Sequence, residues 1–103
     1  MNLLKETLEI LKENGKSITD IKWIGGDDWS LSPDEVDIKT VINFDYDDGF
    51  GWVEIEEDFV VVGDDWWLER HEYDGSEWWE FKTLPQKPSS QAIKRIKTTD
   101  KFN

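Results

Sequence analysis

The single histidine, His71, is the side chain with the most versatile chemistry near neutral pH, because an imidazole titrates there. General acid–base catalysis would require it beside a positioned substrate. The chain has no cysteine, which excludes a thiol nucleophile and a thiolate zinc site, and no serine nucleophile motif surrounds the histidine. We interpret His71 as a strand residue that packs on Trp78. The sequence thus favours a protein that is not an enzyme and needs no cofactor.

Carboxylates are the second group of side chains that could do chemistry. The chain has 24 of them, so pairs spaced as in a glycosidase carry little meaning. The loop that contains Asp45, Asp47 and Asp48 could offer hard oxygen ligands to Ca²⁺. It departs from the EF-hand pattern, because Phe50 stands where that loop needs glycine. These three residues are weak metal candidates, and we expect no specific metal site.

Two pairs of adjacent tryptophans, Trp66-Trp67 and Trp78-Trp79, could stack on sugars or nucleic-acid bases. A base-binding platform usually lies in a basic groove, whereas these pairs lie among acidic residues. Neighbouring side chains on a strand point to opposite faces, so one tryptophan of each pair should be buried. Trp67 and Trp78 are the candidates for exposed contacts, and tryptophan is a favoured anchor in protein interfaces.

Charge is distributed unevenly along the chain. The formal net charge is −12. Residues 20–81 hold 20 acidic and three basic side chains, whereas residues 82–103 hold six basic and one acidic side chain. The first part repels phosphates and anionic membranes and attracts basic surfaces, including those that normally hold nucleic acid. The alternative is that the acid only aids solubility.

The N-terminal half predicts two helices and a strand. Leucines at positions 4, 8 and 11, with Leu3 and Thr7 beside them, form the apolar stripe of a helix over residues 2–14, and Gly15 ends it. Residues 18–24 read as a strand. Ser32 and Glu35 have the spacing of a capping box with Pro33 at the first helical position, which predicts a second helix over residues 33–43.

The C-terminal half predicts three strands over residues 59–62, 66–73 and 76–83. Gly63-Asp64 is typical of a type II′ turn and Asp74-Gly75 of a type I′ turn. Both turns place the same apolar side chains on one face of a meander: Phe59, Val61, Trp66, Leu68, Trp79 and Phe81. A helix should cover this face. The other face is aromatic and of mixed charge, and it includes Trp67, Glu69, His71, Tyr73, Trp78 and Glu80.

This register carries an electrostatic cost. It places Glu69 opposite Glu80 and Glu72 opposite Glu77, and like charges across a ladder are mildly destabilising. Unfavourable pairs on a rigid hairpin suggest that a basic partner neutralises them.

We therefore expect one α+β domain over residues 1–85, with two helices packed on a tryptophan-rich antiparallel meander of three to four strands. A flexible basic tail should follow over residues 86–103. No continuous apolar run of a signal peptide or of a bilayer span is present, so we expect a soluble, cytoplasmic protein.

The segment 58–85, DFVVVGDDWWLERHEYDGSEWWEFKTLP, resembles a recurring segment of small uncharacterised proteins of phages and prophages of Gram-positive bacteria. The sequence of residues 66–81 is the most specific part of this resemblance. The loop 45–51, DYDDGFG, also resembles the corresponding loop of these proteins. The resemblance implies a phage accessory setting, in which small acidic proteins often inhibit host defence, as anti-CRISPR and antirestriction proteins do. It supplies no functional residues.

The leading hypothesis is an acidic inhibitor or modulator that docks on a basic nucleic-acid-binding surface of a host protein, such as a CRISPR effector. It would not bind nucleic acid or a membrane itself. The charge would come from Glu69, Glu72, Asp74, Glu77 and Glu80, and the anchors would be Trp67, Tyr73 and Trp78. The alternatives are a carbohydrate- or Ca²⁺-binding module and a phage structural or assembly protein. The sequence leaves the oligomeric state open.

Overall fold

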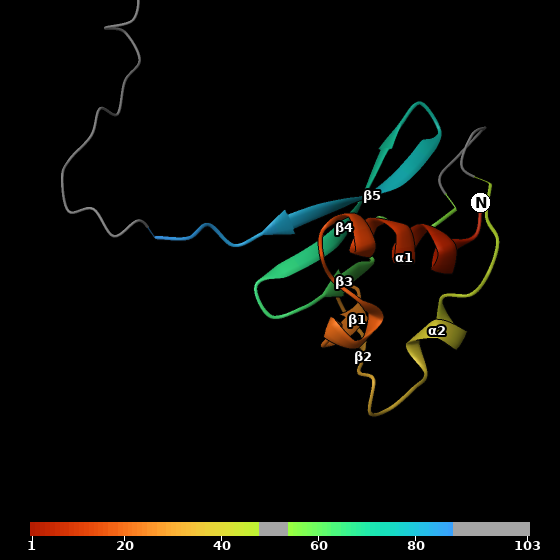
Figure 1. Ribbon diagram of the computed structural model, residues 1–103. Helices are drawn as coiled ribbons and strands as arrows, with labels where there is room; N and C mark the ends of the chain where they lie inside the picture. Colours follow the sequence, from red (N-terminus) through yellow and green to blue (C-terminus); the bar gives the residue numbers. More distant parts are fainter. Residues whose placement is uncertain (48–53, 88–103) are drawn as a thin grey trace, which may run out of the picture.

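The chain folds as two short helices against a single antiparallel sheet. The structure, a computed structural model, describes residues 1–47 and 54–87. Its elements are α1 (Leu3–Glu13), a 3₁₀ turn (Ile18–Asp20), β1 (Trp23–Gly25), β2 (Ser30–Leu31), α2 (Ile38–Val41), β3 (Val60–Val62), β4 (Trp66–Tyr73) and β5 (Ser76–Thr83). The strands lie in the order β2-β1-β3-β4-β5, and α1 packs across β4 and β5 (Figure 1). The α+β expectation is confirmed, but the sheet has five strands rather than three or four.

The first helix begins and ends where its sequence predicts, and its buried stripe is centred on Leu3, Thr7 and Leu11 rather than on Leu4, Leu8 and Leu11. Asn2 caps it by accepting the Lys5 N–H, and Gly15 follows with a φ of +72°. The fully buried side chains are Leu3, Thr7 and Leu11, whereas Leu8 is exposed. The Thr7 hydroxyl accepts the indole N–H of Trp79 at 2.8 Å, so this hydrogen bond draws Thr7 rather than Leu8 against the sheet.

The segment between α1 and β3 differs most from expectation. The predicted strand over residues 18–24 divides into the 3₁₀ turn and the shorter β1. The Glu35 carboxylate accepts both the N–H and the hydroxyl of Ser32, which is one half of a capping box. A single turn follows, and α2 starts only after a second cap at Asp37. The β-branched residues of this stretch favour helix weakly, which fits a helix of four residues rather than eleven.

Two hairpins of the sheet use the same tetrapeptide, Gly-Asp-Asp-Trp. In each, the glycine N–H donates to the tryptophan carbonyl, at 3.0 Å for Gly26 and Trp29 and at 2.9 Å for Gly63 and Trp66. A Cβ on Gly63 would lie 2.1 Å from the indole of Trp66. The glycine is therefore required because the indole packs over it.

This turn corrects the predicted register of β3. A turn at Gly63-Asp64 would place Val61 opposite Trp66. Val61 instead pairs with Leu68, because Asp64 and Asp65 form the turn. The shift is by two residues. Since side chains alternate with a period of two, every predicted core residue stays on its predicted face.

The β4–β5 hairpin has the predicted bounds and register. Leu68 pairs with Phe81, and Arg70 pairs with Trp79. Asp74 and Gly75 form the tight turn with φ values of +53° and +86°, as a type I′ turn requires. Only residues 67–69 of β4 pair with β3, so the rest of the hairpin projects beyond the other strands (Figure 1).

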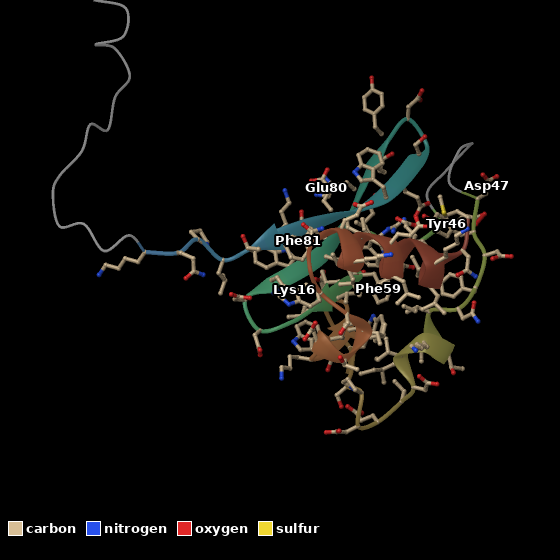
Figure 2. All side chains as sticks on the ribbon, viewed as in Figure 1. Lys16, Tyr46, Asp47, Phe59, Glu80 and Phe81 are labelled. Carbon is tan, nitrogen blue, oxygen red and sulfur yellow. The ribbon has the colours of Figure 1, made fainter. Side chains whose placement is uncertain are left out.

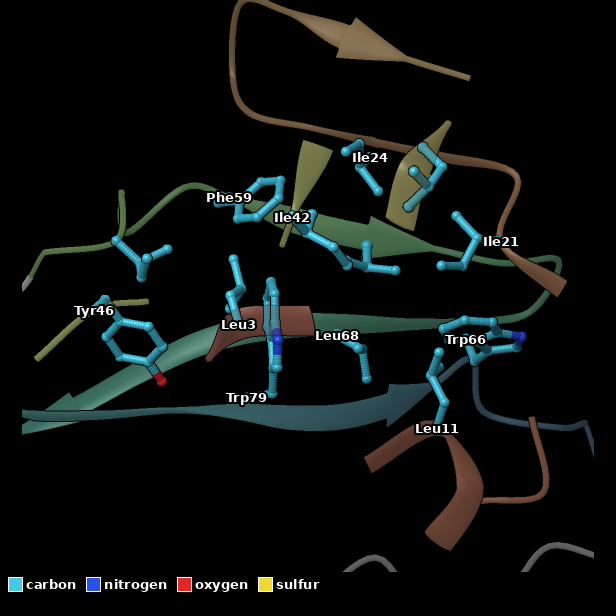
Figure 3. Packing of buried hydrophobic residues seen from close by; sticks show 13 residues of the cluster. Leu3, Leu11, Ile21, Ile24, Ile42, Tyr46, Phe59, Trp66, Leu68 and Trp79 are labelled. Carbon is cyan, nitrogen blue, oxygen red and sulfur yellow. The ribbon is translucent and has the colours of Figure 1, made fainter. Parts of the chain in front are cut away.

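The buried apolar side chains form one cluster between the sheet and the helices. Trp79 lies near its centre, with Leu3 of α1 on one side and Leu68 of β4 beside it (Figure 3). Phe59 contacts Trp79 at a ring separation of 5.5 Å, and Trp66 stacks on Phe81 at 5.6 Å. The predicted apolar face of the sheet is thus the core face.

We predict that Gly75→Val destabilises the protein by about 1–2 kcal/mol, because a β-branched residue is strained in the left-handed region. Ser76→Val is the matched control, since Ser76 is an exposed strand position where valine fits. Urea unfolding followed by tryptophan fluorescence gives both values. Equal stability of the two variants would contradict the tight turn.

Candidate binding surface

The face of β4 and β5 that points away from α1 carries the residues predicted for binding, and we call it the open face. Its rungs are Trp67 with Lys82, Glu69 with Glu80, and His71 with Trp78. The Trp78 side chain is 37% exposed, and the Glu69 and Glu80 side chains are about one-third exposed. Glu80 and the core residue Phe81 extend from adjacent positions of β5 (Figure 2).

The carboxylates of Glu69 and Glu80 both have hydrogen-bond partners within the sheet. His71 lies between the two carboxylates, with Nε2 at 2.6 Å from Glu69 and Nδ1 at 3.5 Å from Glu80. Trp67 donates its indole N–H to Glu69 at 2.7 Å, and Trp78 donates to Glu80 at 3.1 Å. These contacts offset the predicted repulsion between Glu69 and Glu80 within the protein, so the repulsion does not by itself require a basic partner.

Both carboxyl groups are held in the ionised form. The Trp67 indole and then His71 lower the pKa of Glu69 below its ordinary value. The Trp78 indole and then Lys82 lower the pKa of Glu80 in the same way. Hydrogen bonds to the charged form favour that form. The open face therefore keeps two fixed negative charges between two indoles.

The tip of the hairpin holds a second group of predicted residues. Glu72 and Asp74 are exposed, and the Tyr73 side chain is 76% exposed. A tyrosine exposed to this extent covers little of its own molecule, so its ring is free to contact another one. The tip and the open face together present Glu69, Glu72, Asp74, Glu80, Trp67, Tyr73 and Trp78.

Glu77 is the exception, and its predicted role as a surface charge is wrong. It lies on the core face, where its side chain is only 1% exposed and pairs with Arg70 at 2.9 Å. Its two oxygens also accept the N–H groups of Glu54 and Ile55. A carboxylate with all these partners is part of the interior and is closed to a partner protein.

Arg70 forms the centre of a buried ionic cluster that supports the hairpin from the core side. Its guanidinium contacts Glu77 of β5 and, at 3.2 Å, Glu6 of α1. Glu6 also accepts the backbone N–H of Trp79 at 3.0 Å. One arginine thereby joins α1 to both strands of the part of the hairpin that β3 does not reach.

Aromatic rings complete the surroundings of Arg70. The guanidinium carbon lies 4.7 Å from the centre of the Trp79 ring and 5.4 Å from that of Tyr46. The Tyr46 hydroxyl donates to Glu6 and accepts from Arg70, and burial, then the Glu6 hydrogen bond, raises the pKa of Tyr46. Arg70 Nε has no hydrogen-bond partner among the described residues.

Sequence reasoning missed this cluster, although one sign of it was present. Arg70 is one of only three basic residues between positions 20 and 81, and strand alternation already put it on the core face beside Leu68. A lone cation on the buried face of a strand needs a buried anion. Glu77, on the same face of the partner strand, was the nearest available one.

The weak metal candidates do not converge. Asp45 accepts a hydrogen bond from the Asn2 side chain, and the Asp47 N–H donates to Glu54. Asp48 lies outside the described residues. Within residues 1–47 and 54–87, no group of three or more His, Cys, Asp or Glu side chains has the arrangement of a metal site.

Comparison with protein-family models, curated protein sequences and solved structures gives no match for this chain. In the part of the chain that the structure describes, no helix has the length and apolar character needed to cross a membrane.

We predict that Trp78→Phe raises the pKa of Glu80 toward its ordinary value and leaves Glu69 unchanged, since it removes the first indole donor only. Trp67→Phe is the reciprocal control and should raise the pKa of Glu69. Because both values are lowered by folding, these carboxylates stabilise the protein above about pH 4.5, and this contribution is lost as the pH falls. Carbon-detected NMR titration measures both values, and a common shift in both variants would contradict the pairwise contacts.

We also predict that Trp79→Ala costs about 3–5 kcal/mol, as a large-to-small change in a core does. Trp78→Ala should cost much less, because its ring lies at the surface against His71. Thermal and urea unfolding of the two variants make the comparison. If both variants unfold equally early, both faces of the sheet are buried, which would contradict the open face.

Proposed function

We propose that this protein is a non-catalytic binding protein of the phage accessory type, which docks its open face and hairpin tip on a basic surface of a host protein. The target would be a surface that normally holds nucleic acid, as in a CRISPR effector. By occupying it, the protein would act as an inhibitor or modulator in the host cytoplasm. The observation that carries the proposal is a sheet surface with ionised carboxylates set between partly exposed indoles.

Electrostatics supports the choice of partner. Residues 20–81 carry a formal charge of about −17, and a field of that sign accelerates encounter with basic surfaces and repels phosphates. The same charge argues against direct binding of nucleic acid or of anionic lipid. Surfaces that bind nucleic acid are rich in Lys and Arg, which makes them suitable counterparts.

The arrangement of the anchors supports a protein partner rather than a small ligand. Trp78 stacks on His71 at a ring separation of 6.5 Å and donates its indole N–H to Glu80. Its ring is therefore held in place before binding, which lowers the entropy lost on association. Tyr73 adds a more exposed ring at the tip, and the acidic residues around both rings would pair with cations of the partner.

The test is capture of host proteins on the immobilised chain, with identification by mass spectrometry at low and at moderate salt. We expect nucleic-acid-binding proteins to be retained and to be displaced by double-stranded DNA. Glu72→Gln with Asp74→Asn should reduce retention at least tenfold, because it removes two charges at the tip without touching the internal network.

Glu9→Gln with Glu13→Gln is the matched control, because it removes the same charge from the exposed side of α1. Retention by this variant should stay within about twofold of the original. Equal losses in both variants would show that only net charge matters. Capture of no nucleic-acid-binding protein at either salt concentration would contradict the proposal.

A further inference from the structure

An apolar groove lies away from the open face, between α2 and the segment that leads into β3. We call it the Trp29 groove. It has a volume of about 230 Å³ and is lined on its apolar side by Trp29, Val41, Ile42, Phe44, Ile55 and Phe59. Trp29 stacks on the buried Phe59 at a ring separation of 5.7 Å, so the floor of the groove is continuous with the core.

Several of the apolar side chains that line the groove are partly exposed to solvent. Trp29 is 42% exposed and Phe44 is 44% exposed. Val41, between them in the lining, is also exposed. Contiguous apolar surface of this kind commonly marks a binding site. An apolar side chain placed there would remove several neighbouring residues from water at once.

The rim of the groove is acidic, so a segment that covers it should be positively charged. Glu54 and Glu56 belong to its lining, and further carboxylates continue from it along the same edge of the molecule: Glu57, Asp58, Asp27 and Asp28. None of these six forms an ion pair with a Lys, Arg or His of residues 1–47 and 54–87. The complementary occupant combines apolar side chains with several cations.

One segment of the chain itself has this composition. Residues 92–97 read Ala-Ile-Lys-Arg-Ile-Lys, with two isoleucines and three cations in six positions. No other stretch of the sequence combines branched apolar residues with so dense a positive charge. We propose that this segment docks in the Trp29 groove of the same molecule, with Ile93 and Ile96 on the apolar lining and the cations along the acidic rim.

The chain is long enough for this contact. The Leu84 N–H donates to the Asp65 carbonyl, which fixes Leu84 at the end of the sheet away from Phe59. From strand rise and strand spacing, these two residues are about 20 Å apart. Ile93 and Ile96 follow Leu84 by nine and twelve residues, which span about 30–40 Å when extended. Residues 85–87 are exposed and free to redirect the chain.

This inference is independent of the proposed function, because it concerns a different surface and needs no host protein. A docked segment would cover the second acidic surface of the molecule and leave the open face accessible. Its three cations would offset part of the charge repulsion among the carboxylates of the rim.

The 103-residue chain has no cysteine, which allows a direct test in the whole of this chain. Thr99→Cys creates a single attachment site for a nitroxide spin label, two residues beyond the segment. We expect the label to broaden the NMR signals of the Phe44 and Ile55 amides and of the Trp29 indole. The amides of Glu72 and Asp74 at the hairpin tip should keep their intensity.

Ile93→Ser with Ile96→Ser in the labelled protein should restore the signals at the groove. Lys87→Gln with Lys101→Gln is the matched control outside the segment and should leave the broadening in place. Broadening that is absent from the groove, or that survives the isoleucine substitutions, would overturn the proposal. A second sample mixes two copies: one carries the spin label, and the other is isotope-labelled and carries no spin label. Broadening of the groove signals of the isotope-labelled copy would show docking between molecules and would overturn the intramolecular contact.

Discussion

A single buried cation, Arg70, determines how the parts of this molecule are held together. Its side chain is 3% exposed, and a charge taken from water at that depth is tolerated only with excellent pairing. Glu6 and Glu77 supply that pairing, and the rings of Tyr46 and Trp79 flank the guanidinium. Glu6 lies in α1, Tyr46 follows α2, and Glu77 and Trp79 lie in β5, so the need to pair one arginine fixes the relative positions of three segments.

The cluster also explains why the hairpin can project beyond β3. A two-stranded ribbon alone is marginal in water, and its far half has no third strand beside it. Glu6 accepts the Trp79 N–H on the edge strand β5, which removes one exposed donor from a sheet edge. Glu77 binds the backbone of Glu54 and Ile55, and so ties the segment that precedes β3 to the same hairpin. The reverse side of the open face is anchored in this way.

The charged side chains have different surroundings on the two faces of the hairpin. On the core face, ion pairing is obligatory, because an unpaired carboxylate in the interior is strongly destabilising. On the open face, His71 and the two indoles share the charge of Glu69 and Glu80, while water reaches all of them. The first arrangement serves stability. The second leaves negative potential and aromatic surface available for a partner.

Much of the sheet followed from its sequence, because turn chemistry and alternation act locally. Asp74-Gly75 specified the register of β4 and β5, and the leucine stripe with Gly15 specified the bounds of α1. The turn at Gly63 was misread by one position, since the requirement for glycine there comes from the indole of Trp66, three positions later. The contacts of Thr7 with Trp79 and of Arg70 with Glu6 were missed because they join residues 72 and 64 positions apart, and alternation alone does not reveal such pairs.

The coupling free energy between Arg70 and Glu77 tests the role of this cluster most directly. It is obtained from urea unfolding at pH 7 of Arg70→Met, of Glu77→Gln, of the double variant and of the original protein. The single Arg70 change should cost about 3–5 kcal/mol, because it leaves buried carboxylates unpaired, and the coupling should reach about 1–3 kcal/mol. If the two single changes add within about 0.5 kcal/mol, the ion pair does not hold the hairpin and the rest of the fold together.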